Sequence, residues 1–332
     1  MKKPLLTLCM MVKNEAENLA RCLQTVQGIV DQIVVVDTGS TDGSKSIAGR
    51  FTDQVFDFTW NNDFSAVRNY ALRHAAGEWI LQLDADERIE PDAWVSVRSL
   101  LSGTKADGLL VKIRNFHPSG DSVQFLDSEQ LRLFRNRPAY RYENRIHEQV
   151  TPSLLRRKGR LQKTDLRILH YGYQKNSKQK AERNLQLIEE ELSSGNDHAY
   201  LLFKKGESCK ALGRFEEAER CFLKVLEKPQ ESLEGELWAT LYLRLAQINL
   251  QRNNFRNAIQ FSEQTLFLQP KNLTAHYVRS VAGLYLQQLD VVQQSLLAIE
   301  KWDHSHILKE DDVHRLKAIL TQLKEKRETV GV

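Results

Sequence analysis

The chain has 332 residues, enough for about two domains that each bury a hydrophobic core. Hydrophobic residues make up 41% of the chain and charged residues 27%, proportions that are ordinary for a soluble globular protein. The formal net charge of +4 is too small to indicate a partner class by itself. No segment approaches the roughly 20 apolar residues of a membrane-spanning helix, so the composition argues against a membrane-spanning protein.

The cysteines and the N-terminus indicate a reducing compartment. The four cysteines form neither a CxxC pair nor a dense cluster, and each lies among apolar neighbours: Cys9, Cys22, Cys209 and Cys221. Two lysines and the apolar run Leu5–Val12 imitate a signal peptide, but the run stops at Lys13 without a small-residue cleavage site. We therefore expect a first strand there and a cytoplasmic protein.

The first hundred residues alternate between strands and helices. Strands are predicted at Leu5–Val12, Gln32–Asp37, Gln54–Phe58 and Trp79–Leu83, and helices at Asn14–Val26, Ser44–Arg50 and Asp63–His74. Asn14, with Glu17 three residues later, is typical of a capping box. The run Ile33–Val36 is typical of a strand buried on both faces, as in parallel sheets. Repeated β-α-β units predict a doubly wound α/β sheet with helices on both faces.

The pattern changes after Pro91. We expect a helix to Leu101, strands at Leu109–Phe116 and Gln130–Phe134, and then an irregular stretch. From residue 135 to residue 183 there are fourteen Lys or Arg against four acids. Such a stretch would attract a sugar-nucleotide diphosphate, an acidic lipid surface or nucleic acid, unless it is simply a solvated basic surface.

The sequence after Gly172 is helical and contains a repeat. The segment Gly213–Ala218 is echoed by Asn253–Ala258 forty residues later, and more faintly around Leu289 after a further thirty-four residues. Proline closes each of the first two units. A thirty-four-residue helix-turn-helix period resembles the tetratricopeptide repeat. The concave faces of such stacks commonly hold peptides or other subunits.

Two carboxylates, Asp84 and Asp86, directly follow the strand Trp79–Leu83. Residues i and i+2 of a strand project to the same side, and open α/β sheets bind their ligands at the carboxyl ends of their strands. Mg²⁺ and Mn²⁺ prefer oxygen ligands, commonly one or two carboxylates with substrate phosphates. The pair therefore predicts a metal-bridged phosphate site, with solvated loop carboxylates as the alternative.

Four segments occur in the order and at the spacing of a known family: residues 9–15 (CMMVKNE), 36–44 (VDTGSTDGS), 62–69 (NDFSAVRN) and 84–86 (DAD). With them the N-terminal half resembles the inverting glycosyltransferases of family two, which have a GT-A fold. Together with the tetratricopeptide-like tail, the chain resembles bacterial peptide glycosyltransferases that modify bacteriocins on Cys or Ser. Residues 145–148 (RIHE) and 170–173 (HYGY) add to this likeness. The expected domains are 1–175 (GT-A) and 176–332 (helical repeats).

The resemblance implies a nucleotide-sugar pocket. Asp37 would accept the uracil N3–H of a UDP-sugar, with a helix N-cap as the alternative role. Asn14 and Glu15 would lie near the base, where plain capping competes as an explanation. Asp84 would hold the ribose or the metal. Arg68 would place a cation beside the diphosphate, unless it forms a helix-surface salt bridge.

The resemblance also implies a metal and a base. Asp86 would ligate Mg²⁺ or Mn²⁺, and His147 would be a third metal ligand or a diphosphate contact, with surface packing as its alternative. His170 is a weaker candidate. Glu129 is the predicted catalytic base, ahead of Asp127 and Glu148, although the chain lacks the Glu-Asp pair that many relatives carry there. A thiol acceptor would need less help, because its pKa is near 8.5.

These features predict an enzyme: an inverting, metal-dependent glycosyltransferase that moves a hexose or N-acetylhexosamine from a UDP-sugar to Cys, Ser or Thr of a peptide or protein. One alternative acceptor is a lipid-linked or lipopolysaccharide-core sugar. An alternative of another class is a non-catalytic repeat scaffold that binds a protein partner. We expect no nucleic-acid partner and do not favour membrane contact, while a homodimer through the repeats stays open.

Overall fold

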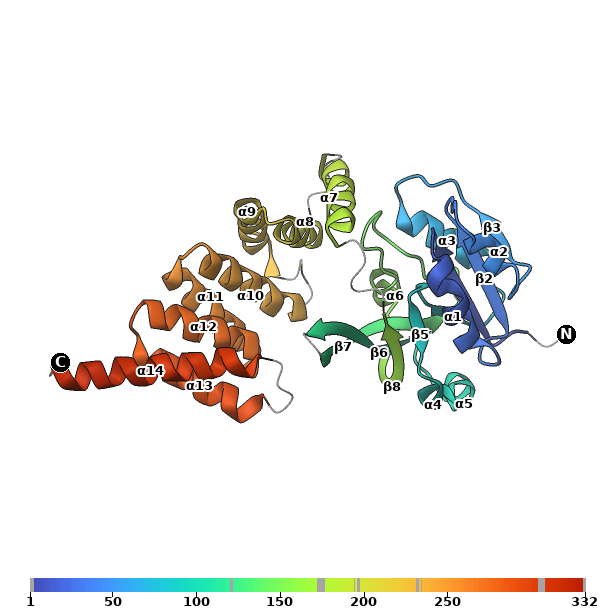
Figure 1. Cartoon of the computed structure of the whole chain (residues 1–332). Coiled ribbons are helices and arrows are strands. Elements are labelled where there is room, and N and C mark those ends of the chain that lie inside the picture. The colour runs from blue at the N-terminus through green and yellow to red at the C-terminus, as the bar shows by residue number, and fades with distance from the viewer. Residues whose placement is uncertain are drawn as a thin grey trace. The chain divides into compact units, whose positions relative to one another are not determined.

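The computed structural model describes residues 3–119, 122–171, 177–193, 195, 198–230, 233, 235–303 and 308–330. The chain divides into two compact units, Met1–Ser177 and Lys178–Val332, which are described separately below (Figure 1). The break after Ser177 lies close to the boundary that the sequence suggests after residue 175.

The first unit is built on one mixed sheet with the strand order β3-β2-β1-β4-β7-β6-β8-β5. Its strands are β1 (Leu6–Val12), β2 (Gln32–Asp37), β3 (Val55–Asp57), β4 (Trp79–Gln82), β5 (Glu87–Ile89), β6 (Gly108–Ser119), β7 (Ser122–Arg135) and β8 (Leu161–His170). Strands β3, β2, β1 and β4 are parallel to one another, and β7 runs antiparallel to β4. The parallel half confirms the predicted β-α-β units.

Helices cover both faces of this sheet. They are α1 (Ala16–Val26), α2 (Ser44–Ala48), α3 (Phe64–His74), α4 (Pro91–Trp94), α5 (Val97–Gly103) and α6 (Thr151–Arg156). In β2, Val35 packs into the core that includes α1, while Val34 and Val36 pack into the core that includes α3. A strand with apolar neighbours on both faces requires an unbroken apolar run, which explains the sequence Ile33–Val36.

Two predictions for the first unit were wrong. Asn14 does not cap α1: the N-cap is Glu15, without a side-chain bond, and Asn14 adopts a φ of +55°. Its side-chain oxygen instead accepts the backbone N–H of Thr41 at 2.8 Å, so a tertiary contact replaces the local one. The helix expected from Pro91 to Leu101 is broken into α4 and α5.

The second half of the sheet was only partly predicted. The hairpin β6–β7 is longer at both ends than the two strands expected from the sequence, and β5, α6 and β8 were missed. Strand β8 mixes the buried Leu166 and Ile168 with the charged Lys163, Asp165 and Arg167. Each of these charges has an ion-pair partner on another strand or loop, so a sequence that looks irregular and basic forms a strand.

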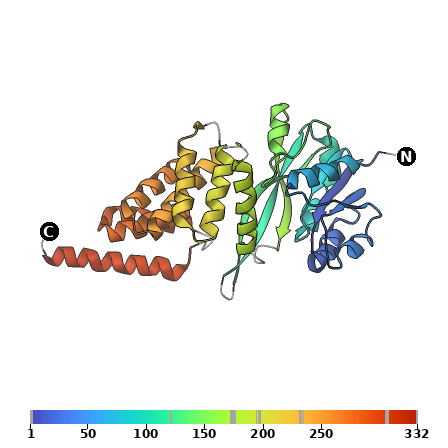
Figure 2. The ribbon, with the colours of Figure 1, turned by 90° about the horizontal axis from the view of Figure 1, so that it is seen from above.

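The second unit consists of helices. These are α7 (Ser177–Ser193), α8 (Ala199–Ala211), α9 (Phe215–Leu226), α10 (Gly235–Gln251), α11 (Phe255–Leu268), α12 (Leu273–Tyr285), α13 (Leu289–Trp302) and α14 (Glu310–Val330). Pairs α8–α9, α10–α11 and α12–α13 pack as successive hairpins (Figure 2). Within the described residues, no helix is both long and apolar enough to cross a membrane.

The three hairpins share one turn geometry. Gly213, Asn253 and Gln287 have φ values of +76°, +59° and +55°. In each case the next residue donates its backbone N–H to a carbonyl five residues earlier: Arg214 to Cys209, Asn254 to Asn249 and Gln288 to Gly283. A left-handed residue with this bond ends an α-helix. The turns recur at the predicted spacings, which confirms the repeat.

Candidate functional site

The loops that follow β1 and β4 bring carboxylates together at one edge of the sheet. Asn14 and Glu15 follow β1, Asp37 ends β2, and Asp84 and Asp86 follow β4. The pKa of Glu15 is raised by burial, and the negative charges of Asp86 and Asp84 raise it further, against a hydrogen bond from Asn18. These charges act on one another only because the loops after β1 and β4 face each other.

Asp37 is a buried carboxylate with one oxygen in use. Its Oδ1 accepts the backbone N–H groups of Gly39 at 2.9 Å and Ser40 at 2.8 Å, and the residue is 1% exposed. Among the described residues, no hydrogen-bond donor reaches its Oδ2. A buried acceptor without a donor is unfavourable unless a ligand supplies one. The alternative role as a helix cap is wrong, because α2 begins at Ser44 with Gly43 as its N-cap.

Asn14 ties the loop after β1 to the loop after β2. Its backbone N–H donates to Ser40 Oγ at 3.0 Å, and its side chain accepts from Thr41. The next residue, Glu15, donates its N–H to Ser44 Oγ at 2.8 Å. Asn14 therefore fixes the shape of the edge where Asp37 and Glu15 lie, whether or not it also touches a ligand.

Arg68 is a buried cross-link, not a surface ion pair. It is 7% exposed on α3. Its Nη2 lies 2.9 Å from Asp84 Oδ1, and its Nε lies 2.6 Å from Glu148 Oε1. Burial lowers the pKa of Arg68, but the charges of Asp84 and Glu148 outweigh it, so the pKa lies well above its ordinary value. The guanidinium therefore orients Asp84, and its predicted contact with a diphosphate stays a prediction.

Glu87 and Arg132, which the sequence analysis did not select, hold the turn after β4. Glu87 is 2% exposed and pairs with Arg132 of β7. Its other carboxylate oxygen accepts the backbone N–H of Asp84 at 2.9 Å. Burial raises the pKa of Glu87, and Arg132 opposes this effect. In the sequence, Glu87 stands out only as a third acid directly after Asp84-Ala85-Asp86. Its partner Arg132 lies forty-five residues away in the chain, so the pair cannot be recognised from local sequence.

Asp86 lies beside His170, the weaker of the two histidine candidates. Its Oδ2 is 3.4 Å from His170 Nε2, and His170 Nδ1 is 2.8 Å from Asn115 Oδ1. Burial lowers the pKa of His170, but the hydrogen bond to Asp86 and the nearby acids raise it overall. The antiparallel pairing of β5 with β8 places Glu87 opposite His170, which explains this proximity. Tyr171, the next residue of the 170–173 motif, stacks on Phe116, with ring centroids 4.9 Å apart, and Gly172 and Tyr173 lie outside the described residues.

The predicted metal ligands are Asp86 and His147. His147 lies in the loop between Glu143 and Gln149, which are joined by two backbone hydrogen bonds, and has a φ of +55°. Its predicted role stays a prediction. In the part of the chain that the structure describes, no group of three or more His, Cys, Asp or Glu is suited to hold a metal. Two carboxylates on one turn, Asp84 and Asp86, still fit a Mg²⁺ or Mn²⁺ ion whose remaining ligands are substrate phosphates.

Each of the three candidate bases is ion-paired. Glu129 of β7 lies 2.7 Å from Lys163 Nζ of β8 and is partly exposed. Asp127 forms two 2.9 Å bonds with Arg114, which lower its pKa. Glu148 pairs with Arg68 and through it connects to Asp84. Pairing alone therefore does not single out one base.

The basic stretch is less basic in three dimensions than in the sequence. Several of its cations pair with acids that lie outside residues 135–183: Arg137 with Asp107, Lys163 with Glu129, and Arg167 with Glu90. Arg156 pairs with Glu143 inside the stretch. A count of charges along the chain therefore overstates the free positive charge of this surface.

The sequence matches known protein families and relatives. Residues 7–160 match the family model described as Glycosyl transferase family 2, and residues 199–227, which span α8 and α9, match a tetratricopeptide repeat. A TPR repeat-containing protein of Synechococcus elongatus is 36% identical over 270 residues, covering 76% of this chain and 66% of that protein.

Two further curated relatives carry names that describe an activity or a process. The SPbeta prophage-derived glycosyltransferase SunS of Bacillus subtilis is 25% identical over 289 residues, covering 83% of this chain and 66% of SunS. The succinoglycan biosynthesis protein ExoO of Rhizobium meliloti is 26% identical over 139 residues, covering 40% of this chain and 38% of ExoO. The chain thus spans about two thirds of the length of the S. elongatus and B. subtilis relatives.

Proposed function

We propose that the protein transfers a hexose or N-acetylhexosamine from a UDP-sugar to Cys, Ser or Thr of a peptide or protein, with inversion at the sugar carbon. The chain carries a glycosyl transferase family 2 domain of GT-A fold, followed by a tetratricopeptide-like repeat unit. The observation that carries this proposal is the convergence of Glu15, Asp84 and Asp86 at the sheet edge where Asp37 ends β2. This is the edge at which open α/β sheets bind nucleotides.

Asp37 supplies the base contact. No donor of the described residues reaches its Oδ2, and the N3–H of uracil is a donor that would satisfy it. The Oδ1 bonds to Gly39 and Ser40 hold the carboxylate in place. Asn14 holds the neighbouring loop against the turn after β2. Uracil recognition in this proposal therefore uses a carboxylate whose orientation is set before the donor binds.

Asp86 and Asp84 would hold a Mg²⁺ or Mn²⁺ ion together with the donor diphosphate, and His147 is proposed to support that site. When bound, the ion supplies a Lewis acid that stabilises the departing UDP. The protein's own contribution is to fix the carboxylates. Arg68 holds Asp84 from the side of α3, and Glu87 holds the backbone of the same turn.

Glu129 is the proposed base that takes the acceptor proton. Its ion-pair partner is Lys163. The Lys163 side chain is 69% exposed and the Glu129 side chain is 38% exposed. Exposed ion pairs contribute only about 0–1 kcal/mol, so an acceptor hydroxyl or thiol can replace the lysine at low cost. A Glu129→Gln variant should lose more activity with a Ser acceptor than with a Cys acceptor, because a thiol releases its proton more easily.

Donor turnover tests the proposal. Purified protein with Mn²⁺ should hydrolyse or transfer a UDP-sugar, and Asp86→Asn should lower the rate by about a hundredfold or more. Asp53→Asn is the matched control, because Asp53 is an exposed acid away from this edge, and it should leave the rate unchanged. Equal rates in wild type and Asp86→Asn, or no UDP-sugar turnover at all, would reject the enzyme proposal in favour of a scaffold.

A lipid-linked saccharide acceptor is the second candidate, and the similarity to the succinoglycan biosynthesis protein ExoO favours the saccharide part of it. Flotation with anionic liposomes separates the two acceptor classes. A peptide-modifying enzyme should stay in the unbound fraction at physiological salt, whereas an enzyme acting on lipid-linked sugars should float with the vesicles.

A further inference from the structure

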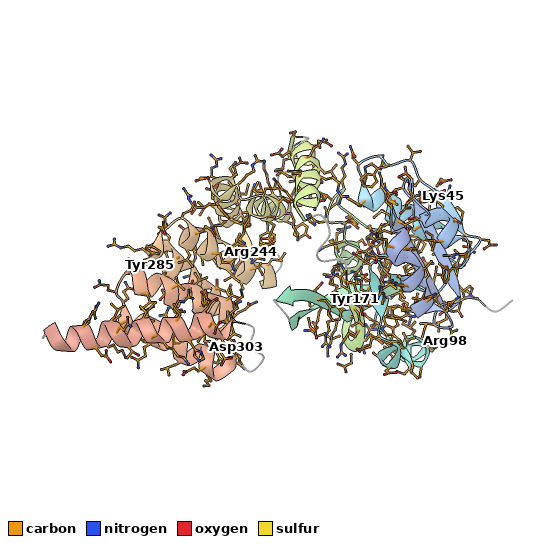
Figure 3. All side chains as sticks on the ribbon, in the orientation of Figure 1. Lys45, Arg98, Tyr171, Arg244, Tyr285 and Asp303 are labelled. Carbon is orange, nitrogen blue, oxygen red and sulfur yellow. The ribbon has the colours of Figure 1, made fainter. Side chains whose placement is uncertain are left out.

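The first helices of two successive hairpins, α8 and α10, carry three positive charges around the acid Glu207. We define the α8–α10 basic cluster as Lys204, Lys210 and Arg244 together with the single acid Glu207. Arg244, labelled in Figure 3, lies on α10, and its Nε is 2.7 Å from Glu207 Oε1 on α8. This bond joins the two helices and places the positive charges of both on one surface.

The two lysines lack the partner that Arg244 has. Neither Lys204 nor Lys210 pairs with a carboxylate among the residues that the structure describes. Lys204 Nζ lies instead over two aromatic rings, 5.4 Å from the Tyr200 centroid and 5.7 Å from that of Phe203. The neighbouring Lys205, in contrast, pairs with Glu189 of α7 at 2.9 Å.

The electrostatics of the cluster agree with this picture. Burial lowers the pKa of Lys204, Glu207 raises it and Arg244 lowers it, with a net decrease. Burial and Arg244 likewise lower the pKa of Lys210 against Glu207. Three positive groups and one negative group therefore share a partly buried surface, and an anion placed there would gain from all three cations.

We propose that the α8–α10 basic cluster is a docking surface for an acidic segment of the acceptor peptide, whose Asp or Glu carboxylates pair with Lys204, Lys210 and Arg244. Charge complementarity selects this occupant. The half-buried ring of Tyr200 beside Lys204 adds apolar area that a peptide can contact. This inference rests on the proposed function in taking the acceptor to be a peptide, and it assigns the recognition of that peptide to a surface remote in sequence from the sugar-transfer residues.

Fluorescence anisotropy with the full chain tests the docking surface. The probe is a fluorescein-labelled peptide of alternating Asp and Ser, and its control carries Asn in place of every Asp. The acidic probe should bind and the Asn control should not. The double variant Lys204→Gln/Lys210→Gln should weaken binding about tenfold, while Lys271→Gln, at an exposed turn outside the cluster, should leave it unchanged.

Glu207→Gln gives an independent test if the double variant folds poorly. Removing the one negative charge should tighten binding of the acidic probe about threefold. Raising the ionic strength to about 1 M, where the Debye length is about 3 Å, should weaken binding of the wild type. Equal binding of both peptides, or affinity unaffected by Glu207→Gln, would overturn the proposal.

Competition separates other anionic partners. Phosphatidylglycerol vesicles or single-stranded DNA that displace the acidic probe at lower concentration than unlabelled acidic peptide would reassign the surface to a membrane or a nucleic acid and overturn the proposal. A UDP titration of the same preparations keeps the two proposals apart. If UDP does not bind while the acidic probe binds through the lysines, the transferase proposal fails and the docking surface stands.

Discussion

Two groups of buried or partly buried charge, one in each unit, differ in how they are paired. At the sheet edge of the first unit, the buried cations Arg68 and Arg132 each pair with acids of the same unit. In the second unit, Lys204 and Lys210 are partly buried without a carboxylate among the described residues. A charge paired internally fixes geometry, whereas a charge without an internal partner remains available to a ligand. We therefore assign positioning to the first network and recognition to the second.

The largest expected effect comes from breaking the internal network. Arg68→Met should lower the free energy of unfolding by about 3 kcal/mol, because Glu148, with a side chain only 14% exposed, becomes an unpaired charge. Lys45→Gln breaks an exposed pair with Asp57 and should leave stability unchanged. Urea unfolding of both variants measures the difference. A loss at Arg68 no larger than at Lys45 would mean that the network does not fix the edge.

A second, smaller effect probes the packing that supports the docking surface. A Cβ added at Gly206 of α8 would lie 2.4 Å from the ring of Phe222, which is fully buried and cannot move aside. Gly206→Ala should therefore cost about 2 kcal/mol of stability. Gly235→Ala, at the start of α10, meets no atom within 4 Å and should leave stability the same or slightly higher. Thermal unfolding distinguishes the two, and equal melting temperatures would contradict the close α8–α9 packing.

The smallest effect concerns the repulsion among the edge carboxylates. Burial, followed by the charges of Asp86 and Asp84, holds the pKa of Glu15 above its ordinary value of 4.5, against the Asn18 hydrogen bond. The folded protein thus keeps this proton to a higher pH than the unfolded chain does. The contribution of Glu15 to stability should fall as the pH rises from about 4.5 through its folded-state pKa, and the full penalty applies above it.

Glu15→Gln removes that titration. The variant should be more stable than wild type near pH 7, with the difference disappearing near pH 4. Glu78→Gln, an exposed acid in the same unit, is the control and should show no such crossover. Denaturation midpoints measured at both pH values decide the point. If Glu15→Gln is less stable than wild type at neutral pH, the carboxylates do not repel one another as proposed.

The same contrast explains what the sequence could and could not predict. The carboxylates of Asp37 and Asp84 were placed at one edge because each follows an apolar strand, and parallel strands end together. The repeat was visible because its turn residues, such as Gly213 and Asn253, recur at fixed spacing. Both signals are local in the chain.

The missing parts depend on contacts between distant segments. His170 lies beside Asp86 only because β8 pairs with β5, and β8 was hidden by charges whose partners lie elsewhere in the chain. Arg132 was hidden for the same reason: its acid, Glu87, is on another strand. Asn14 has the sequence context of a helix cap, but its side-chain oxygen accepts the backbone N–H of Thr41, twenty-seven residues away. The partners of charged and polar side chains are set by the tertiary fold, and hydrophobic periodicity along the sequence does not predict them.

Titration calorimetry of UDP into wild type and Asp37→Asn, with Mn²⁺ present, measures how much Asp37 contributes to donor binding. Wild type should bind UDP, and Asp37→Asn should bind it about tenfold or more weakly, because an N–H bond to a charged acceptor is lost. The fold should be unchanged, since an amide oxygen can still accept from Gly39 and Ser40. Equal UDP affinity in the two proteins would exclude Asp37 as the uracil contact, and no UDP binding by wild type would exclude this edge of the sheet as a UDP-sugar site.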